Sequence, residues 1–175
     1  IHLIPAIPAL RAFAIGQLGE RRYKGLFAVV SGIGLGMIVV GFAIADPNPR
    51  VFDPFPAART IAPYAMTVSF ILFASANMRG HLRHAAKHPM LLGLGIWGTV
   101  HLLANGDLRG TILFGAFLAF AVIDLVSAVS RHAVKSFVPE LKFDAMAIVG
   151  GTAVALVVML LHRFLFGVPA TAFSL

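Results

Sequence analysis

The sequence contains no cysteine and few charged residues, and both shortages narrow what the protein can be. Without cysteine the chain cannot form disulfides, thiolate metal sites or cysteine-ligated iron–sulfur clusters. Asp, Glu, Lys and Arg make up 12% of the 175 residues, whereas apolar residues make up 59%. A chain this short cannot hide that much apolar surface from water by folding. The composition therefore predicts a protein that lies in a lipid bilayer.

Acidic residues are especially scarce, since seven stand against 14 lysines and arginines and the formal net charge is +7. A basic chain can indicate nucleic-acid binding. Here the basic residues lie at the ends of apolar stretches and not along one amphipathic face, which argues against nucleic acid as a partner. Any bound metal would need histidine, carboxylate, amide or methionine ligands, because thiolates are absent.

Five apolar stretches are long enough, or nearly so, to cross ~30 Å of hydrocarbon as helices. They are residues 25–45, 61–78, 89–105, 111–129 and 145–166, and Pro63 suits an early position in the second helix. The stretches lack the alternation of a membrane β-barrel, so only helices are plausible. The sequence predicts an all-α fold, a polytopic transmembrane helix bundle that forms a single domain over residues 1–175.

The apolar stretch 1–10 suggests a further helix at the N-terminus. Because the sequence begins at Ile1 and not at Met, we expect residues to be missing upstream and this stretch to be the tail of a sixth transmembrane helix, ending near Arg11. A short interfacial segment is the alternative. In the helical case His2 would lie ~14 Å from Arg11, near the middle of the membrane.

The loops differ in their content of basic residues. The loops before 25–45, between the second and third stretches, and between the fourth and fifth hold nine lysines and arginines, whereas the opposite loops hold three. By the positive-inside rule, the basic loops 79–88 and 131–142 face the cytoplasm. Glycines within the stretches are expected to allow close helix packing, namely Gly32, Gly34, Gly36, Gly41, Gly93, Gly95 and Gly98.

Histidine at membrane depth is the most informative polar feature. His101 lies twelve residues after Pro89, ~18 Å along a helix, and its imidazole is too short to reach water as a lysine would. Such a group needs a hydrogen-bond acceptor or a metal. Two neutral histidines on different helices, here His2 and His101, can ligate one haem iron from both sides. A packing role for both is the alternative.

The other histidines are weaker candidates. His81 and His84 lie in a cationic loop that would repel a metal ion, so we interpret them as solvated. His88 stands at the start of the third helix, where the positive end of the helix dipole favours a neutral imidazole. His132 and His162 each neighbour an arginine and are interpreted as residues of the membrane–water interface.

Four further polar residues are candidates for a site. Asp124 interrupts the fourth stretch, where it could be protonated, pair with Arg131 or hydrogen-bond between helices. Asn105 and Asp107 flank a glycine in a pattern typical of a tight turn, with Asp107 capping the next helix, and the turn could border a pocket near His101. Asn77, in the second stretch, could bond to its own backbone or to a neighbouring helix.

Two motifs resemble the signature of the NnrU membrane protein family. They are His88-Pro89-Met90-Leu91-Leu92-Gly93, followed by Trp97, and His101-Leu102-Leu103-Ala104-Asn105-Gly106-Asp107. The early His2-Leu3-Ile4-Pro5 with Arg11, and Tyr23-Lys24-Gly25-Leu26, are similar as well, so the resemblance runs from His2 to about Arg131. The family implies a multi-pass protein of the bacterial inner membrane, linked to nitrite and nitric oxide metabolism in denitrifying bacteria.

The family is also similar to zeta-carotene 15-cis isomerase, an integral membrane enzyme that uses haem b. Its functional histidines match His2, His88 and His101. The resemblance therefore implies haem b, with iron bound by His2 and His101 and with His88 important in a role that it does not define.

Three functions follow from these expectations, and whether the protein is an enzyme stays open. The first is a haem protein that handles electrons or a small gas ligand. The second is a haem-dependent cis–trans isomerase of a carotenoid-like polyene, with a hydrophobic tunnel lined by Phe70, Phe73, Trp97, Phe114, Phe117 and Phe120. The third is an accessory subunit without chemistry of its own, which would use its glycine faces to pack into an oligomer or a larger membrane complex.

Overall fold

The computed structural model describes residues 1–170, and these residues form seven helices. The helices are α1 (Pro8–Leu18), α2 (Glu20–Ile44), α3 (Pro56–Ser75), α4 (His81–Ala86), α5 (Pro89–Asn105), α6 (Leu108–Ser130) and α7 (Leu141–Phe166). Within residues 1–170 the only β-type pairing is an isolated bridge between Arg50 and Asp107. The all-α prediction is therefore confirmed.

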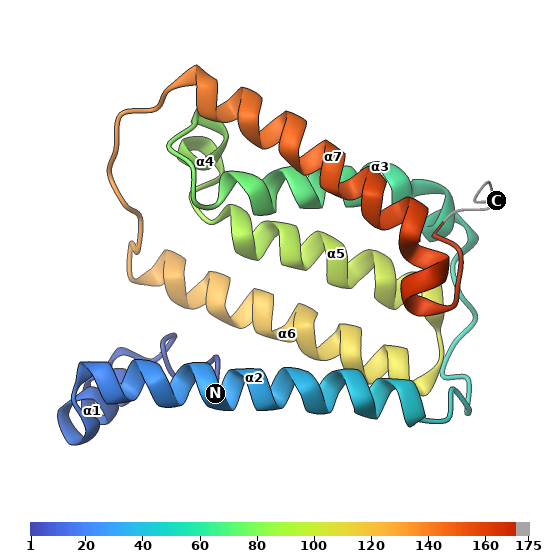
Figure 1. The fold of residues 1–175 in the computed structure, drawn as a ribbon, viewed down its shortest axis with the longest axis horizontal. Coiled ribbons are helices and arrows are strands. Elements are labelled where there is room, and N and C mark those ends of the chain that lie inside the picture. The colour runs from blue at the N-terminus through green and yellow to red at the C-terminus, as the bar shows by residue number, and fades with distance from the viewer. Residues whose placement is uncertain (171–175) are drawn as a thin grey trace.

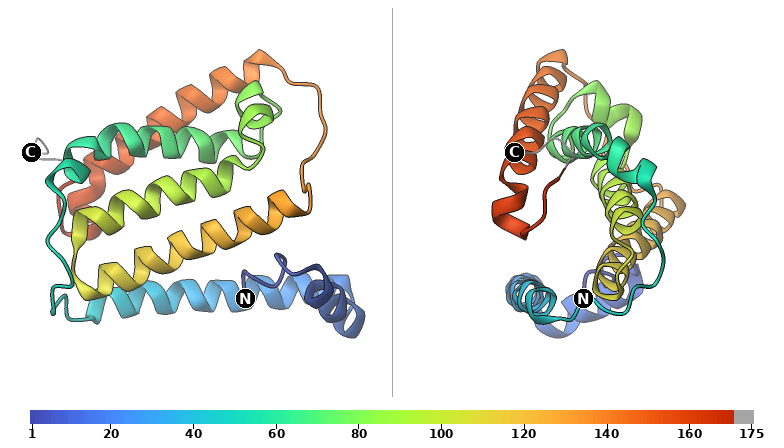
Figure 2. Two further views of the ribbon diagram at one scale, coloured as in Figure 1. Left: turned by 180° about the vertical axis from the view of Figure 1, so that it is seen from behind. Right: turned by 90° about the vertical axis from the view of Figure 1, so that its right-hand side faces the viewer.

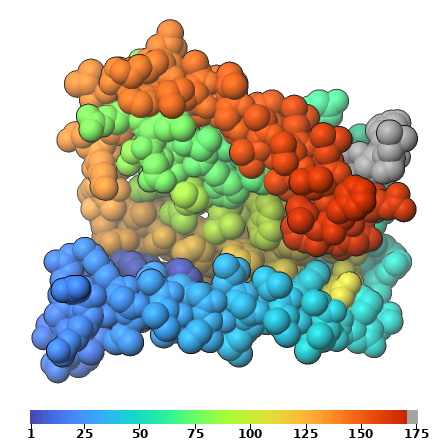
Figure 3. Space-filling view, in the orientation of Figure 1, coloured from blue at the N-terminus to red at the C-terminus, as the bar shows by residue number. Residues whose placement is uncertain are grey.

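The five long helices lie in the spatial order α2, α6, α5, α3, α7 and form one curved layer (Figure 1). Seen end-on, the layer has the shape of a C, with α2 and α7 at its two ends (Figure 2). α3 packs against both α5 and α7, and α5 packs against α6. The space-filling view shows that the inner face of the layer is hollowed between α7 and α2 (Figure 3). This concave face can present side chains to a bound molecule.

Four helices, α2, α3, α6 and α7, are long and apolar enough to cross a membrane. Each of the five predicted stretches does contain a helix, and the third has the predicted bounds, Pro89–Asn105. With 17 residues, however, α5 is at the lower limit for a spanning helix, so the prediction of five spans is confirmed for four. The placement of Pro63 is wrong, because α3 begins at Pro56 and Pro63 lies inside it.

The N-terminal residues differ from the predicted helical tail. Residues 1–7 form turns, α1 begins at Pro8, and the helix continues past Arg11 to Leu18. Proline disfavours a helical conformation in the residue before it, and Pro5 and Pro8 impose that restriction twice within a few residues. The expectation that residues 1–10 are a helix ending near Arg11 is therefore wrong for this segment, and His2 lies in a turn.

Small residues allow α3 to approach its two neighbours. A Cβ added to Gly93 of α5 would lie 3.0 Å from the Ser69 carbonyl oxygen of α3, and the buried Ser69 hydroxyl donates to the Gly93 carbonyl at 2.8 Å. On the other side of α3, a Cβ added to Gly151 of α7 would lie 2.5 Å from the Cα of Ile71. These contacts confirm close packing at Gly93 and reveal a closer one at Gly151, in the α3–α7 interface.

By contrast, α2 packs little against the rest of the bundle. Its glycines at 32, 34, 36 and 41 have no atom within 4 Å of an added Cβ, so the prediction of close packing is wrong for them, as it is for Gly95. α2 is attached at its C-terminus by Arg109, whose guanidinium donates to the carbonyls of Phe42 and Ala45 and lies 4.7 Å from the centre of the Phe42 ring. Arg109 thus satisfies carbonyls at the end of α2.

The basic loops gather at one end of the bundle, where α2, α5 and α7 begin and α3 and α6 end (left in Figure 1). Residues 46–55 and the turn before α6 lie at the opposite end, together with the C-terminus of α7. This antiparallel arrangement is the one that the alternation of basic loops predicts.

Candidate functional site

His101 lies one turn before the end of α5 and is half-buried. Its Nδ1 is 2.8 Å from the carbonyl oxygen of Trp97, one turn earlier in the same helix. A carbonyl can only accept, so Nδ1 carries the proton of this hydrogen bond, and in the neutral imidazole Nε2 has the lone pair. Metal-binding histidines usually have this arrangement, in which the second ring nitrogen donates to a carbonyl or carboxylate.

Aromatic rings surround the His101 imidazole on α5 and α6. The ring centres of Trp97 and Phe114 lie 4.7 and 4.9 Å from the centre of His101, and Trp97 also contacts Phe117 at 5.4 Å. Phe114 reaches back to Phe42 of α2, at 6.4 Å. These contacts bring together three of the six aromatic residues predicted for a tunnel. Phe70 and Phe73 pair with each other on α3, at 5.9 Å.

His162 of α7 is the second imidazole at this place, and the sequence interpretation of it as a simple interface residue missed this. Its ring centre lies 6.5 Å from that of His101, with 32° between the ring planes. Its Nδ1 is 2.7 Å from the carbonyl oxygen of Val168, so Nδ1 donates the hydrogen bond here too. Two imidazoles bound to opposite sides of one metal ion have ring centres ~6.4 Å apart, given a metal–nitrogen distance of ~2.0–2.1 Å.

His2 lies elsewhere on the bundle. Its exposed ring contacts Phe27 of α2 at 5.2 Å and Phe120 of α6 at 6.1 Å, and so it bridges two helices that otherwise pack little. Phe120 is six residues beyond Phe114, the α6 neighbour of His101, which corresponds to ~9 Å along the helix. The structure thus places His2 and His101 against different parts of α6 and does not bring them together.

His88 is the residue immediately before α5, as predicted. Its Nε2 is buried and has no hydrogen-bond partner among residues 1–170. It lines a cavity of about 610 Å³ at the basic end of the bundle, together with Asp124 and Arg131. Asp124 and Arg131 do not form the predicted pair within the described chain; Arg131 instead donates to the Ser127 carbonyl at 3.0 Å.

The remaining predicted site residues have structural roles or lie apart. Asp107 accepts a hydrogen bond from the amide of Gly110 at 2.8 Å and so caps α6, as predicted. Asn105 donates Nδ2 to the His101 carbonyl, and Gly106, with φ of 75°, makes the turn between the two helices. Asn77 is exposed in a turn that follows α3, so its expected place inside a helix is wrong.

Asp144 is a structural residue that the sequence reasoning did not identify. Its carboxylate accepts from the amides of His81 and Leu82 and contacts His81 Nδ1, with distances of 2.8–2.9 Å. It therefore caps α4 from the first turn of α7, and loop 79–88 contains a short helix and not only solvated residues. Nothing in the sequence around Asp144, at the start of α7, indicates that its carboxylate caps α4.

Replacing Asp144 by alanine is expected to lower stability by about 2 kcal/mol, because two part-buried amides at the start of α4 lose their acceptor. In mild detergent this corresponds to a fall in Tm of roughly 4–8 °C. The control is Glu140→Ala, which removes only an ion pair to Lys142 whose side chains are largely exposed. Equal melting of the two variants would contradict the capping role.

Among residues 1–170 there is no group of three or more His, Asp or Glu side chains that could hold a metal ion. The two-histidine arrangement at His101 and His162 does not supply the three or four protein ligands of a zinc site. It does fit a metal whose remaining ligands come from a macrocycle, as in haem.

Fold and site together define a polytopic helical membrane protein in which two histidines meet among aromatic rings. The family model described as NnrU protein matches residues 1–170, and the chain belongs to this family. No curated protein and no solved structure gave a match.

Proposed function

We propose that the protein is a haem b-binding membrane protein of the NnrU type, with Nε2 of His101 as an axial ligand of the iron. The observation that carries the proposal is the pair of imidazoles from α5 and α7, with centres 6.5 Å apart and each with Nδ1 against a backbone carbonyl. Packing alone gives no reason for two imidazoles from different helices to lie at the spacing of a shared metal.

Two residues compete for the opposite side of the iron. The family resemblance assigns that role to His2, whereas the described geometry favours His162, because its ring is the one at metal-bridging distance from His101. His88 precedes His101 by thirteen residues, which is ~20 Å along the axis of α5, and so it would not bind the same iron.

The chain's own residues would determine how the haem is held. Trp97 and Phe114 flank the His101 ring and fix its orientation, while the Trp97 carbonyl fixes which ring nitrogen carries the proton. Phe117 extends this group of aromatic rings through its contact with Trp97. The haem would supply an iron that changes oxidation state and, where one axial position is open, binds a small ligand.

The biological setting follows from the family and from the loops. We place α5 as a fifth spanning helix between α3 and α6, the basic loops in the cytoplasm, and the protein in the bacterial inner membrane. In that setting the protein would serve nitrite or nitric oxide metabolism. A second candidate is isomerisation of a carotenoid-like polyene, which the cluster of aromatic rings formed by Trp97, Phe114 and Phe117 favours.

The test is a reduced-minus-oxidised absorption spectrum of the full-length protein in mild detergent. We expect a b-type signal at about one haem per protein. Binding of nitric oxide to the reduced form would then favour the first role, and conversion of a cis-polyene in a producing host would favour the second. No signal after haem supplementation would contradict the proposal and favour an accessory subunit.

A further inference from the structure

The cavity that His88 lines lies away from the His101 site, at the basic end of the bundle. It has a volume of about 610 Å³ and lies where α1, α4, the start of α5 and the end of α6 meet. Five cationic side chains line it, against one carboxylate, that of Asp124. The cations are Arg11, Arg83, Lys87, Arg131 and Lys135.

These cations are available to a ligand. None of the five forms an ion pair within residues 1–170; the ion pairs there involve other residues. Arg83 and Arg131 are positioned by backbone carbonyls, those of Met78 and Ser127, and Arg83 also lies 5.2 Å from the centre of the Phe137 ring. Such a concentration of positive charge in a cavity attracts a phosphate or carboxylate.

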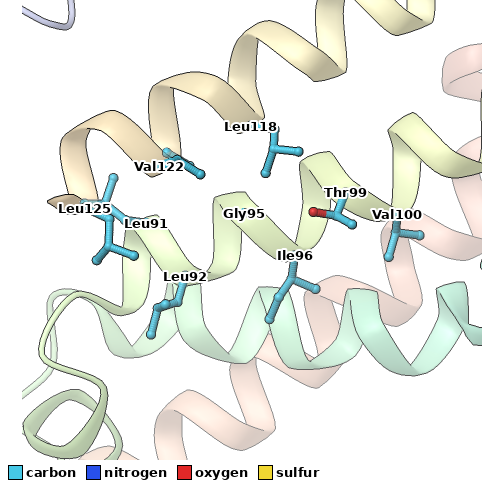
Figure 4. Close-up of a pocket in the computed structure, with 10 residues that line it drawn as sticks. Leu91, Leu92, Gly95, Ile96, Thr99, Val100, Leu118, Val122 and Leu125 are labelled. Atoms are coloured by element: carbon cyan, nitrogen blue, oxygen red, sulfur yellow. The ribbon is translucent and has the colours of Figure 1, made fainter.

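An apolar groove lies between α5 and α6 and adjoins this cavity. The groove has a volume of about 390 Å³, and Leu91 lines both it and the basic cavity. Figure 4 shows its walls, which are Leu91, Leu92, Gly95, Ile96, Thr99 and Val100 of α5 with Leu118, Val122 and Leu125 of α6. From Leu91 to Val100 it runs ~14 Å along the helix.

The groove is open because α5 has a glycine at its centre. Among residues 1–170, no neighbouring atom lies within 4 Å of a Cβ added to Gly95. Gly95 lies two residues before Trp97, which is about 200° around the helix, so the groove and the histidine site occupy opposite faces of α5. A molecule in the groove would therefore not compete with one at His101.

We propose that the cavity and groove together bind one anionic phospholipid, with the phosphate among the cations and an acyl chain between α5 and α6. A charged cavity that opens into an apolar channel at the end of membrane-spanning helices matches the two parts of such a molecule. Basic pockets between helices at the cytoplasmic side are typical of anionic headgroup sites. A free phosphate would use the cations but leave the groove without a role.

The test measures binding of phosphatidylglycerol and phosphatidylcholine to the purified full-length protein in neutral detergent. We expect phosphatidylglycerol to bind at least tenfold more tightly. The double variant Lys87→Gln, Lys135→Gln should weaken the binding of phosphatidylglycerol about twenty-five-fold, since each cation contributes a factor of about five. The matched control is Arg21→Gln with Arg22→Gln, which removes the same charge at the same end of the bundle outside the cavity.

A groove variant distinguishes a lipid from a free anion. Gly95→Leu fills the groove and should weaken phosphatidylglycerol severalfold, whereas Gly150→Leu, at an equally open position on α7, should not. Millimolar inorganic phosphate should not displace the lipid. Equal affinity for the two lipids would overturn the proposal, and so would equal losses of phosphatidylglycerol binding in the two double variants. It would also be overturned if phosphate displaced the lipid and Gly95→Leu bound phosphatidylglycerol as tightly as the unchanged protein.

Discussion

Replacing His101 by alanine is expected to remove most of the bound haem from the protein purified in mild detergent. The reason is geometric, because His101 is the imidazole that the aromatic rings and the Trp97 carbonyl hold in one orientation, with Nδ1 and not Nε2 bonded to that carbonyl. The measurement is haem per protein, from the reduced-minus-oxidised spectrum and a protein assay. We expect a loss of tenfold or more, in line with losing a metal ligand.

Three further variants show which histidine lies opposite His101. If His162 is the second ligand, His162→Ala should shift the spectrum from six-coordinate low spin to five-coordinate high spin, while His2→Ala leaves it unchanged. The reverse result would support the pairing that the family resemblance implies. His84→Ala is the control, since His84 is an exposed histidine of α4 at the opposite end of α5.

Imidazole in the buffer separates loss of a ligand from loss of the fold. In His101→Ala it should enter the space left by the side chain and restore a six-coordinate spectrum. A folded His101→Ala variant that retains its full haem content and spectrum would rule out His101 as a ligand. Loss of haem from His101→Ala with no effect of either His2→Ala or His162→Ala would leave the haem proposal intact and assign a single protein ligand.

The helices could be predicted from the sequence because lipid leaves the backbone few alternatives. Backbone amides in hydrocarbon must be bonded within the chain, so a long apolar stretch becomes a helix whatever its neighbours are. The bounds of α5 were predictable because Pro89 begins it and Gly106 ends it with a positive φ. α4 was not, because a helix of six residues depends on the carboxylate of Asp144, which is 62 residues beyond Leu82.

The candidate site was predictable only where it depends on one helix. His101 stood out by its depth in an apolar stretch, and its hydrogen bond to Trp97 is local. Its approach to His162 depends on the position of α7, which is set by packing against α3 and not by any pattern near either histidine. The role of a glycine is equally hard to predict from sequence. Gly93 and Gly32 both lie in apolar stretches, but of the two only Gly93 packs against another helix within residues 1–170.

The position of α7, and with it that of His162, depends on one glycine, so Gly151→Val is expected to have a large effect on the fold. A Cβ there would lie 2.5 Å from the Cα of Ile71 and 2.8 Å from the Phe70 carbonyl oxygen, and backbone atoms cannot move aside as a flexible side chain does. Overpacking typically lowers the free energy of unfolding by about 1–3 kcal/mol. We expect a loss at or above the upper end of this range, because the added atom meets backbone. We expect Tm to fall by roughly 6–12 °C, or the folded protein to be lost.

Gly150→Val is the matched control, because it makes the same substitution one residue earlier, where an added Cβ meets no atom within 4 Å. The two variants change the intrinsic helix preference of α7 equally, so the difference in their Tm measures the contact with α3 alone. Gly151→Ala, the smallest change, should fall between the control and Gly151→Val and provides a folded variant if valine is not tolerated. Melting of Gly151→Val within about 2 °C of Gly150→Val, less than 1 kcal/mol, would contradict the close α3–α7 contact. If the contact is as described, the folded Gly151→Ala variant should also lose haem when His162 is the second ligand, because a displaced α7 moves that imidazole away from His101.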